Sequence, residues 1–240
     1  MIIRELTWDS HFFGKKIGEL AVSKAGVNQL PQFLQQARTE GFEYLTCKTA
    51  SLENFLIKGL ETQGFNLVDI GITWSINVRS FLSFTSKKPL WKTKGARIAE
   101  HRDIPMLKKM ITSLFSHSRF YRDPFFTRKQ ANSLYRTWIE NSVKGTAADI
   151  VYLVPATGLV ACRKTGRGNG AIVLIGVTAD ARGKGIGTSL LYTAMNWFHT
   201  LGIHTVKART QINNLGAMNF YVRSGFSMKE YDLVFAKILD

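Results

Sequence analysis

The clearest alternation of apolar and polar residues lies in the last third of the chain. An uninterrupted apolar run, Ala171–Val177, has the length of a buried strand, and the following amphipathic stretch, Thr188–Leu201, has the period of a helix. Two further strands are predicted at Thr205–Thr210 and Tyr231–Ile238. Because strands and helices alternate here, we expect an α/β fold around a mixed sheet.

The middle of the chain continues this pattern. Helical periodicity covers Met106–Leu114 and Gln130–Val143, and an Asp-initiated turn precedes the first of these helices. Val151–Val154 and Leu159–Cys162 are separated by a short turn containing Pro and Gly, so they predict a β-hairpin.

The first third predicts its own small α/β unit. Tyr44–Thr49 and Leu67–Ile76 have the pattern of strands, with a helix between them over Leu52–Gln63. A polar, basic stretch, Ser80–Lys94, has the composition of a linker. We therefore expect an N-terminal lobe over residues 1–85, a linker over 86–95 and a larger domain over 96–240.

A glycine-rich turn, Arg182–Gly187, connects the apolar strand to the amphipathic helix. Such a turn binds anions, because unpaired backbone N–H groups and the positive end of the helix dipole meet there. No Gly-Lys-Ser/Thr sequence follows, which excludes a Walker loop, and the glycine spacing does not fit a dinucleotide fingerprint. The sequence predicts a phosphate-binding turn, with an ordinary strand-to-helix turn as the alternative.

Two motifs resemble those of the Gcn5-related N-acetyltransferase (GNAT) family. Arg182, Gly185 and Gly187 match the family's coenzyme A pyrophosphate loop, Arg/Gln-x-x-Gly-x-Gly/Ala. Downstream, the segment Asn214–Phe226 resembles the closing pattern Asn-x-x-Ala-x-x-x-Tyr-x-x-x-Gly-Phe at every defined position. The resemblance covers residues 96–240 and implies a GNAT acetyltransferase fold that uses acetyl-CoA as co-substrate and no metal.

The resemblance also implies a role for individual residues. Tyr221 matches the tyrosine that protonates the departing thiolate, and the amide at a strand bulge near Val177 would face the thioester oxygen. The residues expected to bind the coenzyme are Ile175, Val177, Arg182, Gly183, Lys184, Gly185, Ile186, Gly187, Asn214 and Ala217.

The general base is left open by the sequence. Four residues upstream of the coenzyme loop could take a proton from the acceptor amine: Glu140, Asp123, His117 and Asp149. Nothing in their spacing distinguishes them. A base acting through water, or an amine that is already neutral, are equal alternatives.

The N-terminal lobe repeats part of this pattern. Asn54…Gly64-Phe65 is similar to Asn214…Gly225-Phe226, and Leu60 falls where the second copy has Tyr221. We interpret the lobe as a degenerate half-GNAT that keeps the packing and loses the chemistry. A chance similarity is the alternative.

The start of the chain narrows the family. Leu6–Gly14, with the sequence Leu-Thr-Trp-Asp-Ser-His-Phe-Phe-Gly, resembles the opening of acetyltransferases that act on dTDP-linked amino-dideoxy sugars for surface polysaccharides. Arg119–Phe126 resembles the segment that lines the sugar site of these enzymes, and Trp8, Phe12 and Phe13 are expected to be core between the lobes. The resemblance implies direct attack by the sugar amine. The alternatives are another amine (a protein N-terminus, a polyamine or an antibiotic), or a domain that binds coenzyme A or nucleic acid without catalysis.

Composition sets the remaining limits. The formal net charge of +15 fits anionic partners, yet the basic residues are spread and form no nucleic-acid-binding motif. Cys47 and Cys162 have neither metal-ligand spacing nor a disulfide framework. We expect a cytoplasmic enzyme without membrane attachment and with a small amine substrate. Nucleic acid is not expected as a partner, and a homodimer is left open.

Overall fold

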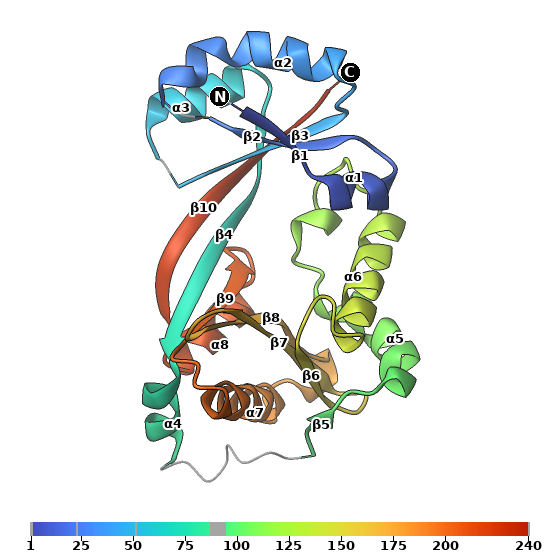
Figure 1. Ribbon diagram of the computed structural model, residues 1–240, viewed down its shortest axis with the longest axis vertical. Coiled ribbons are helices and arrows are strands. Elements are labelled where there is room, and N and C mark those ends of the chain that lie inside the picture. Colours follow the sequence, from blue (N-terminus) through green and yellow to red (C-terminus); the bar gives the residue numbers. More distant parts are fainter. Residues whose placement is uncertain (1, 23, 51, 87–94, 240) are drawn as a thin grey trace. The chain divides into compact units, whose positions relative to one another are not determined.

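A computed structural model describes residues 2–22, 24–50, 52–86 and 95–239 (Figure 1). The chain forms two compact units, and neither is continuous in sequence. The first unit comprises Met1–Ile72, Arg119–Gln130 and Glu230–Asp240, and the second comprises Thr73–Ser118 and Ala131–Lys229. The strands β4 and β10 each contribute residues to both units.

The first unit is a sheet whose two longest helices cover one face. Its elements are β1 (Ile2–Glu5), α1 (Thr7–Phe13), β2 (Ile17–Ala21), η1 (Lys24–Gln29), α2 (Leu30–Thr39), β3 (Tyr44–Thr49), α3 (Asn54–Thr62), β4 (Asn66–Asn77) and η4 (Arg119–Tyr121). Its strands are hydrogen-bonded in the order β1-β2-β3-β10, where β10 is Ser227–Ile238. The pair β2–β3 is parallel, and β1–β2 and β3–β10 are antiparallel.

The two faces of this sheet have different surroundings. Leu45 and Cys47 of β3 and Phe235 of β10 belong to one buried cluster with the apolar sides of α2 and α3. Because successive side chains of a strand point to opposite faces, Tyr44 and Ala236 face the other side. There the Tyr44 ring stacks on Phe125 at 4.2 Å between centroids.

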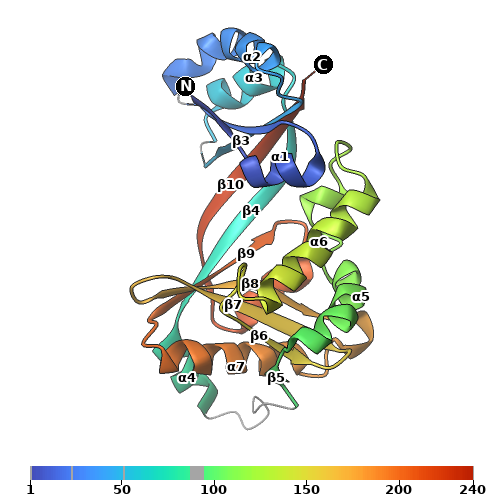
Figure 2. The same ribbon diagram turned by 45° about the vertical axis from the view of Figure 1, so that its right-hand side comes forward.

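The second unit carries the predicted hairpin, the glycine turn and the last helices. Its elements are α4 (Val78–Ser86), β5 (Arg97–Ile98), η3 (His101–Asp103), α5 (Ile104–Leu114), α6 (Arg128–Val143), β6 (Ile150–Val154), β7 (Gly158–Gly166), β8 (Asn169–Val177), η5 (Ala179–Ala181), α7 (Ile186–Thr200), β9 (Thr205–Gln211) and α8 (Leu215–Arg223). The strand order is β9-β8-β7-β6-β5, antiparallel except for the β8–β9 pair. Figure 2 shows α7 along one side of these strands.

The helices α5 and α7 cover opposite faces of this sheet. A Cβ placed on Gly158 would meet Leu190 of α7 at 3.0 Å, and Gly158 is paired with Val177. A Cβ on the adjacent Gly176 would meet Leu114 of α5, also at 3.0 Å. Neighbours in a strand face opposite ways, so the glycines permit close approach of one helix on each side.

Most predicted elements are confirmed, with boundaries that differ by at most four residues. The hairpin forms with Val154 opposite Gly158, and Gly225 ends α8 in the left-handed conformation with φ of 84°. Two expectations are wrong. Part of the predicted linker is helical, since α4 extends to Ser86, and Trp8 is 51% exposed and therefore not core. The remainder of that linker, residues 87–94, lies outside the described residues.

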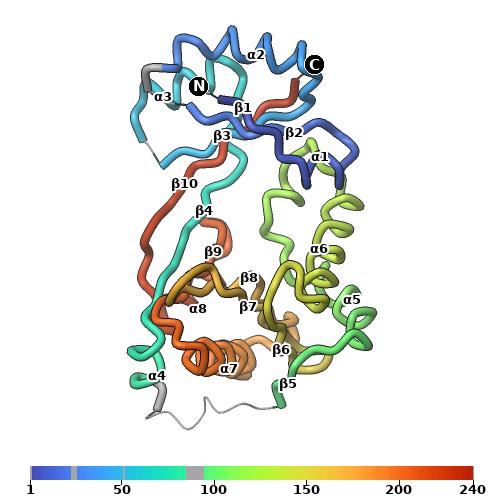
Figure 3. Tube along the Cα trace, in the orientation of Figure 1, coloured from blue at the N-terminus to red at the C-terminus, as the bar shows by residue number. Residues whose placement is uncertain are grey.

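The predicted half-repeat matches in part. α3 and α8 each follow one strand and precede a long one, and both helices end at a glycine with positive φ, Gly64 and Gly225. Leu60 is fully buried, as expected for a packing residue. Asn54, however, lies inside its helix rather than at the N-cap. The long strands that follow the two helices, β4 after α3 and β10 after α8, are neighbours in the sheet (Figure 3). The half-repeat stays a prediction, as does the division of the chain into lobes.

Within the described residues, no helix is both long enough and apolar enough to cross a membrane.

Asp103 provides a test of the second unit's stability. Its carboxylate accepts hydrogen bonds from both terminal nitrogens of Arg97 at 2.7 and 2.6 Å and from the Glu100 N–H at 2.8 Å. These bonds lower the pKa of Asp103 from its ordinary value of 3.8 to about 2. We expect Asp103→Asn to reduce the free energy of unfolding at pH 7 by about 1 kcal/mol, as for the loss of a helix cap.

The sign of the pH dependence follows from the lowered pKa. The stabilisation is present above pH 4 and is lost as the pH falls toward 2, because wild-type Asp103 then becomes protonated. In urea unfolding, the difference between wild type and variant should therefore shrink in acid. Glu5→Gln removes an exposed carboxylate and serves as control. A difference that persists unchanged at pH 2 would contradict this assignment.

Candidate active site

The glycine turn forms a cradle of backbone N–H groups at the start of α7. Gly183 and Gly185 have φ of 75° and 81°, a conformation that favours glycine, and no atom lies within 4 Å of a Cβ built on either residue. The first helical hydrogen bond runs from the Ser189 N–H to the Gly185 carbonyl at 2.9 Å. The N–H groups of residues 186–188 therefore have no acceptor within the helix.

Two positively charged side chains, Arg182 and Lys184, belong to this cradle. Arg182 and Lys184 are exposed, and the Arg182 Nε lies 3.4 Å from the Val177 carbonyl oxygen, so its side chain folds back toward the end of β8. A Cβ on Gly187 would touch Phe220 and Val177 at 3.4 and 3.5 Å. Gly187 thus serves helix packing, whereas Gly183 and Gly185 leave open space where an anion could approach.

The strands β8 and β9 diverge ahead of this turn. They pair in parallel from Asn169↔Thr205 to Ile172↔Ala208, and the hydrogen-bonded ladder between these two strands ends at Ile172. The remainder of β8, through Ile175 to Val177, is paired with β7 alone. Its other edge therefore has free hydrogen-bonding groups, the arrangement that an extended amide ligand needs in order to bind as an added strand.

The bulge of β8 is not where the sequence predicted it. Ala161 and Cys162 of β7 pair with Leu174 and Ile172, so Val173 is the extra residue. The predicted position was near Val177, four residues later. Val173 lies where β8 and β9 separate, which accounts for the divergence: the irregularity bends β8 away from its parallel neighbour.

Tyr221 lies on α8 and is buried among aromatic side chains. Its side chain is 3% exposed and packs against Trp74 and Phe226, with ring centroids 6.0 and 5.1 Å away. Burial raises the pKa of the Tyr221 phenol above its ordinary value near 10. The hydroxyl is therefore protonated at neutral pH, the state that a proton donor requires.

The residues predicted from the second motif are engaged with each other. The Asn214 side-chain oxygen accepts a hydrogen bond from the Ala217 N–H at 3.1 Å and so caps α8. This contact gives both residues a structural role, because it fixes the start of the helix that carries Tyr221.

The four candidate bases are not brought together. Glu140 forms ion pairs with Lys108 and Lys144, and these two lysines lower the pKa of Glu140 to about 2, which makes it a poor proton acceptor. Asp149 accepts a hydrogen bond from the Lys164 N–H at 2.6 Å. His117 is exposed, and Asp123 belongs to the first unit, where its buried carboxylate accepts a hydrogen bond from the Tyr44 hydroxyl.

Sequence reasoning missed Trp74. It lies in β4 and stacks on Tyr221 at an interplanar angle of 26°, and its indole nitrogen is buried without a hydrogen-bond partner in the described part of the chain. Trp74 lies far along the chain from the two motifs, so nothing in the sequence connected it with Tyr221. The available signal was a tryptophan within a predicted strand.

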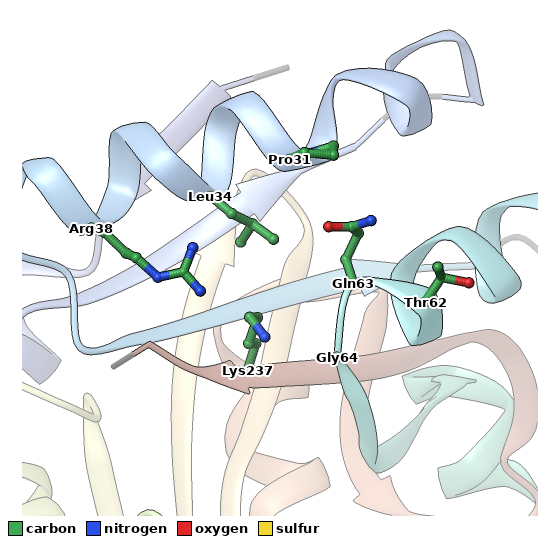
Figure 4. Close-up of a pocket in the computed structure, with 7 residues that line it drawn as sticks. All are labelled: Pro31, Leu34, Arg38, Thr62, Gln63, Gly64 and Lys237. Carbon is green, nitrogen blue, oxygen red and sulfur yellow. The ribbon is translucent and has the colours of Figure 1, made fainter.

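One cavity of about 370 Å³ in the first unit involves none of the predicted residues (Figure 4). Arg38 of α2 and Lys237 of β10 point into it. A Cβ on Gly64 would lie 2.7 Å from the Lys237 ammonium, which thus lies against the carboxyl end of α3. There the positive charge stabilises the helix dipole. We assign this cavity no ligand.

The arrangement of strands, glycine cradle and α8 is that of an acyl-CoA-dependent transferase. Residues 110–226 match the family described as Acetyltransferase (GNAT) family. The chain belongs to this family and is an N-acetyltransferase; enzymes of the family use acetyl-CoA.

Two relatives and one solved structure show which proteins of the family this chain is similar to. The dTDP-fucosamine acetyltransferase of Escherichia coli is 27% identical over 232 residues, which are 95% of this chain and 94% of that protein. A spore coat polysaccharide biosynthesis protein of Bacillus subtilis is 29% identical over 62% of this chain and 51% of its own. A GCN5-related N-acetyltransferase from Sphaerobacter thermophilus has a similar fold, with a TM-score of 0.61 at 15% identity over 93% of this chain and 73% of its own.

Proposed function

We propose that the protein transfers the acetyl group of acetyl-CoA to the amine of a dTDP-linked amino-dideoxy sugar used for surface polysaccharides such as lipopolysaccharide. The observation that supports this substrate is similarity over nearly the whole chain to an enzyme named for a dTDP-amino sugar. The similarity extends through the first unit, beyond the residues that match the family description. A second relative named for polysaccharide biosynthesis is consistent with this class.

The residues of the second unit would hold the donor in three ways. The N–H groups of the turn 182–187 would bind the pyrophosphate, with Arg182 and Lys184 adding positive charge. The free edge of β8 from Val173 to Val177 would pair with the amides of the pantetheine arm. A backbone N–H of the same segment would stabilise the oxyanion of the tetrahedral intermediate.

The transfer then needs one bond made and one broken. The neutral sugar amine attacks the thioester carbonyl carbon, and the carbon–sulfur bond breaks as the intermediate collapses. The thiolate takes the proton of the Tyr221 hydroxyl and leaves as the free thiol of coenzyme A. The proton lost by the amine passes to water, and water then returns a proton to the Tyr221 phenolate, so that the enzyme ends the cycle in its starting state. Tyr221 suits the acid role because its phenol is neutral at the pH of the reaction.

A panel of amines tests the substrate. Release of free coenzyme A should be measured with dTDP-4-amino and dTDP-3-amino sugars, with a polyamine and an N-terminal peptide as alternative acceptors. We expect kcat/KM for one of the dTDP-sugars to exceed that for either control by roughly 10²-fold or more, because a site built for a polar ligand rejects analogues that lack its groups. Good turnover of a control and none of any dTDP-sugar would contradict the proposal.

A further inference from the structure

The first unit contains a second cavity, on the face of its sheet that α2 and α3 do not cover. It has a volume of about 350 Å³ and is lined by Tyr44, Asn66, Leu67, Val68, Arg122, Asp123, Pro124, Ala236 and Ile238. Ala236 and Ile238 alternate along β10 with Phe235 and Lys237, which face the helices.

Apolar side chains gather around this cavity and remain open to solvent. Leu67 is 48% exposed and Ile238 is 47% exposed, although both are large and aliphatic. Val68, Pro124 and the buried Tyr44 complete the apolar part of the lining. Exposed aliphatic residues that line one hollow favour a ligand with a flat or apolar part, because its binding would remove them from water.

The polar groups of the lining have complementary properties. Arg122 is exposed and pairs with no carboxylate among the described residues, so its guanidinium is available to an anion. Asn66 offers an amide N–H₂ donor beside a carbonyl acceptor. Asp123 is held in place, because its carboxylate accepts hydrogen bonds from the Tyr44 hydroxyl and from the Phe125 N–H at 3.0 Å.

We propose that this cavity binds the thymidine diphosphate part of the acceptor. The inference rests on the proposed function for the identity of the nucleotide. The thymine ring lies against the aliphatic side chains, which also contact its methyl group, and Asn66 pairs with the adjacent C=O and N3–H of the base. Arg122 binds the diphosphate. Asp123 fixes the turn that presents Arg122.

Binding of dTDP itself, measured by calorimetry on the intact protein, tests this assignment without catalysis. Arg122→Ala should weaken dTDP binding about tenfold or more, as expected for the loss of a charge-assisted hydrogen bond. Asn66→Ala should weaken it by a factor of about five. The nucleotide dUDP, which lacks only the thymine methyl, should bind roughly fourfold more weakly than dTDP.

Arg38→Ala is the matched control, since it removes an exposed arginine that lines the other cavity of the same unit. It should leave dTDP binding unchanged, and all variants should keep the wild-type circular dichroism spectrum. An equal loss in Arg38→Ala and Arg122→Ala would show that only net charge matters and would overturn the assignment.

The inference and the proposed function can fail separately. If a dTDP-amino sugar is acetylated but its KM is unchanged in Arg122→Ala and Asn66→Ala, the cavity is not the nucleotide site while the function stands. If dTDP binds the cavity as described but only a nucleotide-free amine is acetylated, the substrate proposal fails and the binding site stands.

Discussion

Replacing Tyr221 with phenylalanine should lower kcat by roughly 10² to 10⁴-fold, the usual contribution of a positioned general acid. The aromatic ring would remain between Trp74 and Phe226, so the packing that fixes α8 should persist. The affinity for acetyl-CoA should change little, because the hydroxyl acts on the leaving thiolate and not on the bound coenzyme. Steady-state kinetics together with direct titration of acetyl-CoA would measure both quantities.

The matched control is Tyr192→Phe, which changes a tyrosine of α7 in the same unit and should retain wild-type kcat.

The pH profile of kcat gives a second criterion for the role of Tyr221. Since burial raises the pKa of the Tyr221 phenol, its deprotonation should cause no loss of kcat between pH 7 and its ordinary pKa of about 10. An unchanged kcat in Tyr221→Phe would remove the phenol from the mechanism.

The second large effect is expected at the glycine cradle. In Gly185→Val, the new side chain would occupy the open space beside Gly185, within the turn that we propose binds the pyrophosphate. We expect acetyl-CoA binding to fall below detection in calorimetry while the protein still folds. The substitution also strains the backbone, because φ at Gly185 is 81°.

Gly202 separates these two causes. It has φ of 68° and, like Gly185, no atom within 4 Å of an added Cβ, but it follows the far end of α7. Gly202→Val should therefore lose similar stability on thermal unfolding and retain acetyl-CoA binding. If both variants bind the coenzyme normally, the turn is not the pyrophosphate site.

Local chemistry explains which parts of the fold the sequence could predict. The turn 182–187 and the cap at Asn214 are encoded by consecutive residues, so glycine spacing and a side-chain cap were sufficient. The same holds for the hairpin, whose turn fixes the pairing of β6 with β7.

Long-range packing explains the parts of the fold and of the site that could not be predicted from the sequence. Trp74 meets Tyr221 across more than a hundred residues, and Tyr44 meets Asp123 across 79. The bulge at Val173 depends on the register with β7, which a single strand does not specify. The polar composition after Ser80 concealed the end of α4, because composition alone does not distinguish a surface helix from a linker.

The most direct measurement is the identity of the acetylated product. The protein should be incubated with acetyl-CoA and a dTDP-amino-dideoxy sugar, and the product should be analysed by NMR and mass spectrometry. We expect an acetamide on the sugar nitrogen, with one coenzyme A released per sugar acetylated, and no acetamide formed with Tyr221→Phe on the same time scale. Release of coenzyme A with the sugar amine left unmodified would contradict it.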